Sequence, residues 1–429
     1  MGDSVTKPRL SSASCHVLLV WALQCILLPV GLLALAPEAP RDLIPVTVVF
    51  AAVSVAAGVS YALRVRVAWH LVQVCLLAGW LLGAYYSNRV VFICEALLMV
   101  YLGLWLYARE VREEFAVHVA PREAGVLIVL LVMCALLALL APKFVENRNF
   151  LALLQQFATV GVMAVGMTMV IVLGGIDLSV GSIVALAGCL GAMAYKQGWN
   201  PALAILIALA VGGATGAFNG GFTSCFRINP FIITLGTMSM ARSLANVITN
   251  GNPVHLDRRR EEVLGAIGLT APLRVPTLVW MMAVVVILGH IFLSRTRTGR
   301  HIYYIGANEE AARLSGINVM GVKWLVYALC GLLAGLAAIM QAARLGSGQP
   351  SAGTGDELRV IAAVIIGGAS FTGGEGTVLG ALVGTVILGV LTQGLNLLEV
   401  SSHWKKCVEG AVIIGAVAVG VLRRYRARH

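Results

Sequence analysis

Charged residues are scarce in this chain. Only 12% of its 429 residues are Asp, Glu, Lys or Arg, whereas a soluble domain averages about a quarter. The strict apolar–polar alternation of membrane β-strands is missing too. Apolar runs long enough to cross a bilayer, roughly 17–25 residues, instead recur from end to end. We therefore expect an all-α, polytopic integral membrane protein whose backbone groups are hydrogen-bonded inside helices.

The absence of several sequence motifs excludes some classes of function. The nine cysteines form no CxxC pair, and no His/Cys cluster has ligand spacing, so we expect neither disulfides nor a metal site. No Gly-Lys pair occurs, which excludes a Walker loop and ATP hydrolysis by this chain. No His/Asp/Glu cluster stands out in the spans, which argues against an enzyme. The basic residues behind the net charge of +11 lie in short loops, so the positive-inside rule explains them better than nucleic-acid binding.

The positions of these basic residues predict the topology. Lys7 and Arg9 precede the first apolar run, and "RRYRARH" ends the chain, so both termini are expected in the cytoplasm. About fourteen crossings follow from the apolar runs and loop charges. Four of them fall within residues 1–124. The others are predicted at 126–141, 151–173, 183–195, 203–222, 231–249, 277–293, 324–343, 361–371, 378–398 and 408–422.

The chain divides into two pieces. Residues 125–429 read as one long membrane unit, and residues 1–124 as an extra region of about four helices. A charged segment, "REVREEFAVHVAPRE", marks the boundary between them. Nothing in the first piece indicates chemistry.

The stretch "VLGGIDLSVGSI" places Asp177 in otherwise uncharged surroundings. A single helix over residues 160–195 would be about 54 Å long, more than the ~30 Å hydrocarbon core, so the chain must break. Gly174 and Gly175 can end the first helix, and Asp177 or Ser179 can cap the next. We expect a positive φ at Gly175. Two interpretations stay open: a capped turn at the membrane edge, or a discontinuous helix lining a pathway.

A second motif, "GGASFTGG", matches the first at an offset of 193 (367 − 174). Each follows an inbound apolar run and precedes an outbound helix, which suggests an internal repeat of like orientation. A chance match between glycine-rich segments is the alternative. The apolar run before the second motif is too short to span, which favours a half-helix. The predicted hinge or pathway residues here are Gly367, Gly368, Gly373 and Gly374.

The loop "GRHIYYIGANEEAARLSGINV" is the longest polar stretch of the second piece. Good helix formers, acids at the start and Gly316 at the end predict a short helix. Such a helix at the cytoplasmic face could dock a partner, or it could lie on lipid, although its two acids argue mildly against an anionic surface. The predicted docking residues are Asn308, Glu309, Glu310, Ala311, Ala312, Arg313 and Gly316.

Several segments resemble the permease subunits of bacterial ribose-type ABC sugar importers. They are "GMTMVIVLGGIDLSVGS", "NPFIITLGTM", "GANEEAARLSGINV", "QPSAGTGDELRVIAAVIIGGASFTGGEGTVLGALVG" and "GLNLLEVSS". The resemblance runs in order from about residue 125 to the C-terminus. The extra N-terminal helices depart from this pattern, and their role is unexplained.

The resemblance implies a ten-helix core with discontinuous helices in the bacterial inner membrane. It also implies a permease homodimer, a separate ATPase chain that binds ATP and Mg, and a periplasmic sugar-binding protein. The polar loop is similar to the coupling helix that seats in the ATPase, and "NPFIITLGTM" adds Asn229, Pro230, Thr234 and Thr237 to the pathway residues. The implied substrate is a ribose-like pentose, another monosaccharide or a related polyol. The alternative is an ion-coupled secondary transporter that uses Asp177.

Overall fold

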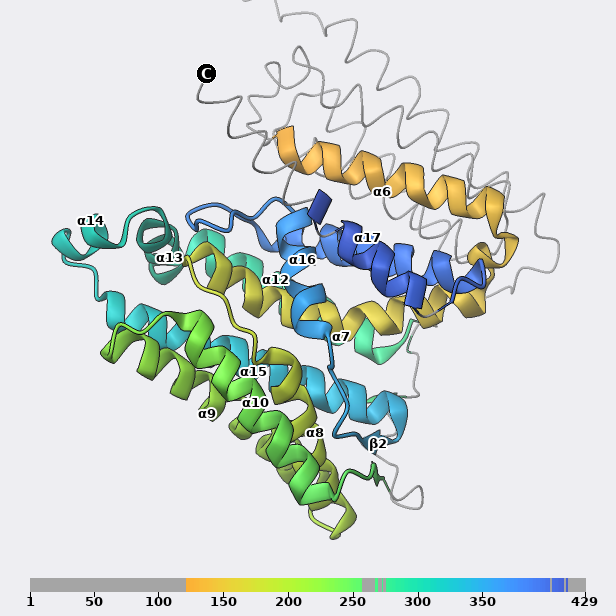
Figure 1. The fold of residues 1–429 in the computed structure, drawn as a ribbon, viewed down its shortest axis with the longest axis horizontal. Helices are drawn as coiled ribbons and strands as arrows, with labels where there is room; N and C mark the ends of the chain where they lie inside the picture. Colours follow the sequence, from red (N-terminus) through yellow and green to blue (C-terminus); the bar gives the residue numbers. More distant parts are fainter. Residues whose placement is uncertain are drawn as a thin grey trace, which may run out of the picture. The chain divides into compact units, whose positions relative to one another are not determined.

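The computed structural model describes residues 121–256, 267–268, 272, 275–401, 403–412 and 414–415. Almost all of this is helix (Figure 1). The four crossings predicted within residues 1–124 lie outside the described residues. The chain forms two compact units: residues 1–150 with 393–400, and residues 151–392 with 401–429. The candidate site lies wholly in the second unit.

The described part of the first unit begins with α6 (Pro121–Leu140), which is followed by the short 3-10 helix η2 (Pro142–Val145). Residues 393–400 belong to the same unit, and a side chain on Gly394 would meet Leu137 of α6. The close contact of these two residues therefore depends on the missing Cβ of Gly394.

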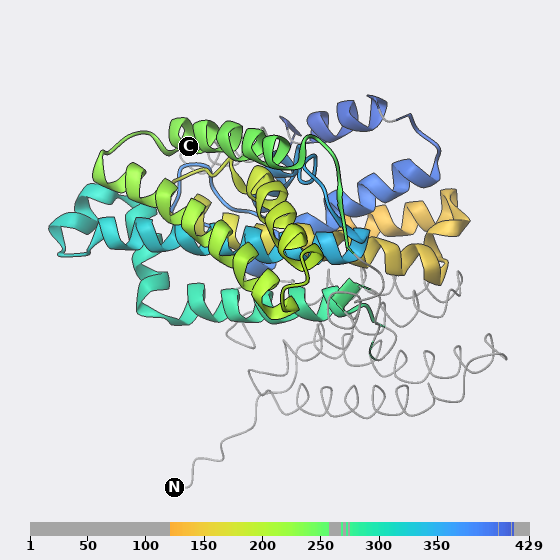
Figure 2. The same cartoon turned by 90° about the horizontal axis from the view of Figure 1, so that it is seen from below.

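The second unit is built from long helices joined by short links (Figures 1 and 2). Its elements in chain order are α7 (Asn147–Val172, which begins in the first unit), α8 (Val180–Lys196), α9 (Pro201–Cys225), α10 (Pro230–Thr249), β1 (Val254–His255), α12 (Thr277–Arg295), α13 (Arg297–Ala307), α14 (Glu309–Leu314), α15 (Val319–Leu345), β2 (Ser347–Gly348), α16 (Asp356–Ile366) and α17 (Val378–Leu397, which ends in the first unit). Residues 403–412 are helical as well.

Six of the described helices are long and apolar enough to cross a membrane: α7 from Leu151, α9, α10, α12, α15 and α17. The predicted spans over these residues are confirmed as helices, with ends that shift by a few residues. Two features were not predicted. The polar loop holds α13 in addition to the expected short helix, and β1 and β2 pair as a two-residue antiparallel ladder in an otherwise helical fold.

Small residues bring α9 and α15 together. A Cβ on Gly212 or Gly216 would overlap backbone atoms of α15, and a Cβ on Gly331 would overlap the backbone of α9. Glycines four residues apart on one helix face let two membrane helices approach to backbone contact. The result is a closely packed pair that supports α8 and α10 on its sides (Figure 1).

Asparagine side chains start several helices. Asn200 and Asn229 are each followed by proline, and each accepts a hydrogen bond from the backbone N–H of the second residue of the helix that follows. Asn308 and Asn318 cap α14 and α15 by accepting from the N–H of the third helical residue. Asparagine is a strong N-cap residue, and proline fits the first helical position because its missing N–H needs no partner there. Local sequence therefore fixes where these helices begin.

Candidate functional site

The first break in the helices is the extended link between α7 and α8. The N–H of Gly175 donates to the Val170 carbonyl, and that of Gly174 donates to Ile171, both at 2.9 Å. Gly174 has a φ of +89°, so it provides the left-handed C-cap. The expectation of a positive φ at Gly175 is wrong, because the cap needs only one such residue. Gly175 is constrained sterically instead: a Cβ there would overlap the Tyr327 hydroxyl.

Asp177 is fully buried in this link. Its Oδ1 accepts hydrogen bonds from the backbone N–H of Ser179, at 2.8 Å, and from the Ser179 hydroxyl, at 2.6 Å. Ser179 takes the N-cap position of α8, but its hydroxyl caps no helix N–H. The carboxylate therefore orders the turn that enters α8. Its Oδ2 has no hydrogen-bond partner in the part of the chain that the structure describes.

A chain of buried hydrogen bonds connects this turn to two other helices. Asn219 of α9 donates to the Ser179 hydroxyl at 2.9 Å, and Thr237 of α10 donates to Asn219 Oδ1 at 2.7 Å. Thr234, also buried, donates to the Pro230 carbonyl at 2.9 Å. The fold thus joins Ser179 of the first motif to Thr237 of α10 in one polar cluster, and Thr234 lies 3.4 Å from the Ile176 carbonyl beside it, whereas Asn229 caps α10 outside the cluster.

Asn219, the central member of this cluster, was missed from sequence. It stands between glycines in the run "GAFNGG", within a long apolar segment. A polar side chain inside a membrane helix is itself a hint of function. This polar residue was visible in the sequence, but its hydrogen-bond partners become known only from the folded structure.

The second break separates α16 from α17. The N–H of Gly368 donates to Ile365 and that of Ala369 to Val364, which is the same capping pattern, and Gly368 has a φ of +98°. The equivalent left-handed glycines are therefore Gly174 and Gly368, at an offset of 194 (368 − 174) rather than 193. The predicted register of the two motifs is off by one residue. The predicted half-helix before the second motif is confirmed as α16, with 11 residues.

The two breaks touch each other. The N–H of Gly374 donates to the Val172 carbonyl at 2.8 Å, and a Cβ on Gly373 would lie 2.9 Å from the Cα of Gly174. Both residues have positive φ, +80° at Gly373 and +76° at Gly374. Motifs almost two hundred residues apart in the chain thus meet through their backbones.

The end of α13 packs against the same point. A Cβ on Gly306 would overlap the Val172 carbonyl and would lie 2.6 Å from the nitrogen of Gly374. Tyr303 donates its hydroxyl to the Gly376 carbonyl at 2.7 Å. Helix α13 therefore contacts both breaks directly.

The predicted short helix follows at once as α14. Asn308 is its N-cap and accepts from the N–H of Ala311 at 3.0 Å. Glu309 pairs with Arg313 at 3.0 Å and with Lys323 of α15 at 2.6 Å, which holds α14 to α15. Among the other predicted docking residues, Glu310 is exposed and Ala312 is buried, and Gly316, predicted at the helix end, has a left-handed conformation with φ +80°.

Between β2 and α16 the chain runs back along α8. A Cβ on Gly348 would lie 2.8 Å from that of Ala192, whereas Gly353 is against Gly181 in the first turn of α8. Arg242 of α10 holds this re-entrant segment, residues 349–355. Its Nη1 donates to the carbonyls of Pro350, at 2.8 Å, and Ala352, at 2.6 Å.

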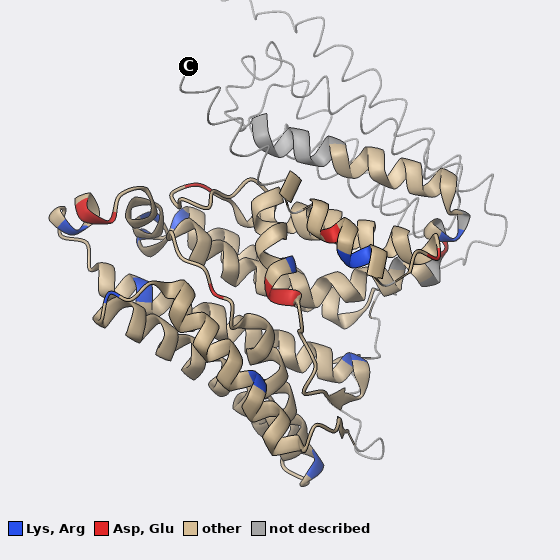
Figure 3. Ribbon diagram, in the orientation of Figure 1, with Lys and Arg blue, Asp and Glu red and all other residues tan. Residues whose placement is uncertain are grey.

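Charged residues are clustered where α16 begins (Figure 3). Arg359 pairs with Asp356 at 3.1 Å and with Glu409 at 3.2 Å. Thr392 donates to the same carboxylate of Glu409 at 2.9 Å. Charges at membrane depth need such partners and commonly mark a functional region. Sequence reasoning did not single out these residues or Arg242, although "GDELR" directly before an apolar run was visible.

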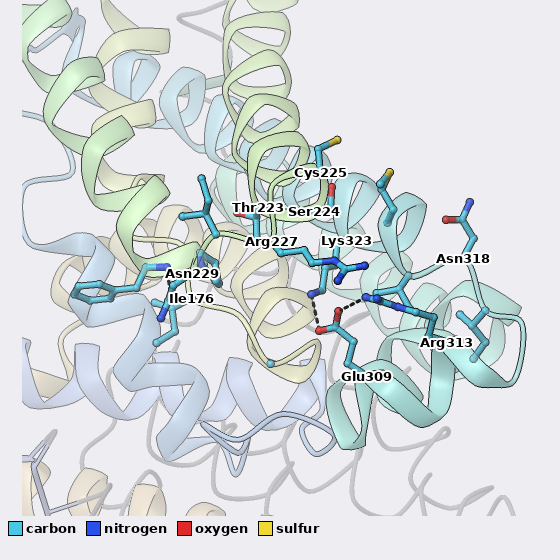
Figure 4. A pocket seen from close by; sticks show the side chains of 17 residues that line it. Ile176, Thr223, Ser224, Cys225, Arg227, Asn229, Glu309, Arg313, Asn318 and Lys323 are labelled. Carbon is cyan, nitrogen blue, oxygen red and sulfur yellow. Dashed lines mark hydrogen bonds and ion pairs between the residues drawn. The ribbon is translucent and has the colours of Figure 1, made fainter.

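A cavity of about 780 Å³ opens beside α14, bounded by the end of α9, the start of α10 and the start of α15 (Figure 4). Gly174 and Ile176 of the first break form part of its wall. The cavity therefore touches the predicted docking helix and the first glycine motif together.

Comparison with known proteins gives a consistent result. The family described as branched-chain amino acid transport system / permease component matches residues 149–417. The ribose import permease of Escherichia coli K12 is 48% identical over 294 residues, which cover 68% of this chain and 92% of that protein. The ribose import permease of Bacillus subtilis is 42% identical over 297 residues, 69% of this chain and 92% of the relative.

A relative with another sugar in its name is the L-arabinose ABC transporter permease of Azospirillum brasilense. It is 35% identical over 308 residues, 71% of this chain and 89% of the relative. No solved structure matches the chain. The matches cover about nine-tenths of each permease, so the resemblance seen in the sequence motifs is confirmed. The chain belongs to this family of transport permeases, as a ribose-type ABC importer permease.

Proposed function

We propose that this chain is the membrane-spanning subunit of an ATP-driven importer in the bacterial inner membrane. Its cargo is a ribose-like pentose, another monosaccharide or a related polyol. The observation that carries the proposal is 48% identity across 92% of a ribose import permease. Identity falls to 35% for a permease named for arabinose and to 36% for one named for allose, so ribose is the first substrate to test.

The partners in this proposal are an ATPase chain, which binds ATP and Mg, and a periplasmic sugar-binding protein. Helix α14 suits the ATPase contact. Its Leu314 is 85% exposed, and Tyr304 of the preceding helix is also exposed, so apolar side chains are presented beside charged ones. Exposed aromatic and apolar anchors rimmed by charge are typical of protein docking surfaces.

In this proposal, movements of the ATPase are transmitted to the transport pathway from α14, through α13, to the two helix breaks. Gly306 lies in backbone contact with Val172 and Gly374, so a displacement of α13 cannot leave either break in place. Packed elements of this kind move together because their contact has no free space. The two glycine motifs then act as hinges that open or close the inner end of the pathway.

The pathway itself is assigned to the exposed face of α10. Four small or polar residues form a stripe along this face, Gly236, Ser239, Ser243 and Asn246, and exposed apolar residues such as Met240 and Val247 lie beside it. Ser351 and Thr354 of the re-entrant segment are exposed as well. Polar side chains avoid lipid, so this face is expected to border water and a second permease copy. In the proposed homodimer each protomer supplies half of the passage.

An ion-coupled secondary transporter is the second candidate. It is favoured by one observation, the buried Asp177 Oδ2 without a described hydrogen-bond partner. A buried carboxylate of this kind could take up and release a proton during transport. The two candidates differ in their energy source.

The experiment that tests the proposal is uptake into proteoliposomes that contain the permease, its ATPase and its binding protein. We expect ribose uptake that requires ATP and persists when ionophores collapse the ion gradients. Arabinose, allose and glucose would be compared at equal concentration with the matching binding proteins. Uptake that needs a proton gradient and ignores ATP would overturn the proposal and support the second candidate.

A further inference from the structure

The cavity beside α14 shares Glu309 and Arg313 with the proposed docking helix, but the proposed function assigns no ligand to it. Its volume, about 780 Å³, lies within the range of small-molecule sites, roughly 300–1,000 Å³. It faces the side that the charge pattern predicts to be cytoplasmic. Its lining includes apolar side chains, such as Ile176, Ile317 and Met320, as well as basic ones. An organic molecule with a negatively charged group would suit such a mixed lining.

The charges in the cavity do not balance. Arg227, Arg313 and Lys323 line it with one acid, Glu309. That carboxylate already pairs with both Arg313 and Lys323. Arg227 has no ion pair or hydrogen bond within the described chain, and its guanidinium extends into the same space as the other two cations (Figure 4). The site therefore carries an excess of two positive charges.

The backbone at Arg227 supports a special position for this side chain. Its φ is +53°, which is uncommon for a non-glycine residue. A residue with a left-handed backbone costs conformational energy and persists where the surroundings require it. Here the conformation makes the sharp link between α9 and α10 that lies at the cavity wall.

Neutral hydrogen-bond donors add to the cations. Asn229 lines the cavity and is exposed. It uses its Oδ1 to cap α10, which leaves its amide N–H groups for another acceptor. The polar wall is thus rich in donors and poor in acceptors.

We propose that this cavity binds a phosphomonoester. A phosphomonoester carries a charge of about −1.5 to −2 at neutral pH and three acceptor oxygens. It would neutralise the excess charge and accept from Arg227, Lys323 and the amide group of Asn229. Its organic part would contact apolar side chains of the wall, such as Ile176. This ligand is distinct from the uncharged sugar of the proposed function.

Two sources can supply that chemistry: a soluble sugar phosphate in the cytoplasm, or a lipid with a terminal phosphate in the inner leaflet. The test uses the intact permease in nanodiscs of phosphatidylcholine. Ribose 5-phosphate is titrated by calorimetry, with ribose and inorganic phosphate as controls. In a second arm the nanodiscs contain phosphatidic acid, and retained lipid is identified by native mass spectrometry.

Three variants are measured beside the wild type. Arg227→Gln removes the unpaired cation, and Asn229→Asp removes the amide donor but keeps the Oδ1 acceptor that caps α10. Arg300→Gln is the matched control, because Arg300 is an exposed arginine of α13 that does not line the cavity. Arg227→Gln is expected to weaken binding by at least about tenfold, since a charge-assisted hydrogen bond is lost, and Asn229→Asp by about threefold to tenfold. Arg300→Gln should change nothing.

Binding of ribose 5-phosphate with this pattern supports the proposal and assigns a soluble ligand. Retention of phosphatidic acid over phosphatidylcholine, lost in Arg227→Gln, supports it and assigns a lipid. Absence of both overturns it, as does equal weakening by Arg227→Gln and Arg300→Gln, which would indicate a general charge effect. None of these readings depends on transport, so they leave the proposed function to its own test.

Discussion

The backbone N–H of Gly374 donates a hydrogen bond of 2.8 Å to the carbonyl oxygen of Val172. Val172 is the last residue of α7, so the second break is attached where the first one starts. Gly306 of α13 lies against both atoms of this bond. Three glycine-containing segments therefore meet where no Cβ atom can be accommodated, and a single residue separates the end of α13 from α14, the predicted docking helix.

Enlarging Gly306 should separate these segments. In Gly306→Ala the new methyl group would overlap the Val172 carbonyl, which is backbone and cannot turn aside. Overpacking of this kind costs roughly 1–3 kcal/mol of stability. We expect a protein that still reaches the membrane but couples ATP hydrolysis poorly, with uptake reduced about tenfold or more. Melting temperature, ATPase rate and uptake in proteoliposomes are the measurements.

Gly410→Ala is the matched control. Gly410 also lies in a helix, its φ is not positive, and no atom lies within 4 Å of an added Cβ. This variant should melt and transport like the wild type. Normal coupling in Gly306→Ala would show that the contact with the two breaks is not part of the transmission path.

Gly175 and Tyr327 form a pair that a double-mutant cycle can test. A Cβ on Gly175 would overlap the Tyr327 hydroxyl, and the ring carbon behind it would be 3.3 Å away. Gly175→Ala should therefore lower stability and uptake, and adding Tyr327→Phe should recover part of both by removing the hydroxyl. Tyr327→Phe alone should be mild, since its hydroxyl lies 3.5 Å from the Ile176 carbonyl, a weak contact. If the effects of the two substitutions simply add, and Tyr327→Phe restores neither stability nor uptake to Gly175→Ala, the steric explanation is contradicted.

The sequence predicted the features that depend on neighbouring residues. The helix at Glu309–Leu314, its end at Gly316 and the half-helix before the second motif all follow from local propensity and capping. The positive φ was placed on Gly175 instead of Gly174, because two adjacent glycines satisfy the same pattern and only the hydrogen bonds decide between them.

Contacts between distant segments could not be read in this way. Asn219 joins Ser179 to Thr237, and Arg242 holds carbonyls of a segment more than a hundred residues later. Such partners depend on how whole helices pack against each other, and a short stretch of sequence does not determine that packing. The presence of a polar residue in an apolar run was visible; the atom it would bind was not.

Glu309 should contribute more to binding of the ATPase than its neighbour Glu310. Glu309→Gln removes both ion pairs that hold α14, to Arg313 and to Lys323. The Glu309 carboxylate is 42% exposed, so each pair is expected to contribute less than about 1 kcal/mol. The permease should stay folded while its affinity for the ATPase falls several-fold, as measured by co-purification and by titration of the ATPase.

Glu310→Gln removes the same charge from an exposed residue with no ion pair in the described chain. It controls for net charge at the docking surface. Equal losses in the two variants would show that ATPase binding senses the charge of α14 and not the position fixed by Glu309.

Arg242 should be required for the ordered re-entrant segment. Its guanidinium donates to the carbonyls of Pro350 and Ala352, and charge-assisted bonds of this kind contribute about 1.5–3 kcal/mol each when well formed. Arg242→Gln is expected to release the segment, with faster hydrogen exchange over residues 349–355 and reduced uptake. Ser239→Ala, one turn earlier on α10, should leave that exchange unchanged. Unchanged exchange in Arg242→Gln would refute the role of this side chain.

Asp177→Asn separates the two candidate functions. Asparagine keeps the Oδ1 acceptor that Ser179 requires, and it removes a charge that is completely buried. The turn into α8 should therefore survive, with a melting temperature equal to or above that of the wild type. In an ATP-driven permease, the uptake rate should stay within about threefold of the wild-type rate and still require ATP, because an amide can accept hydrogen bonds in the turn almost as well as a carboxylate.

An ion-coupled transporter needs a group that gains and loses a proton, which asparagine cannot do. Loss of gradient-driven uptake with normal folding would identify Asp177 as the coupling site, whereas ATP-dependent uptake with an unaltered pH profile would leave it as the residue that shapes the break.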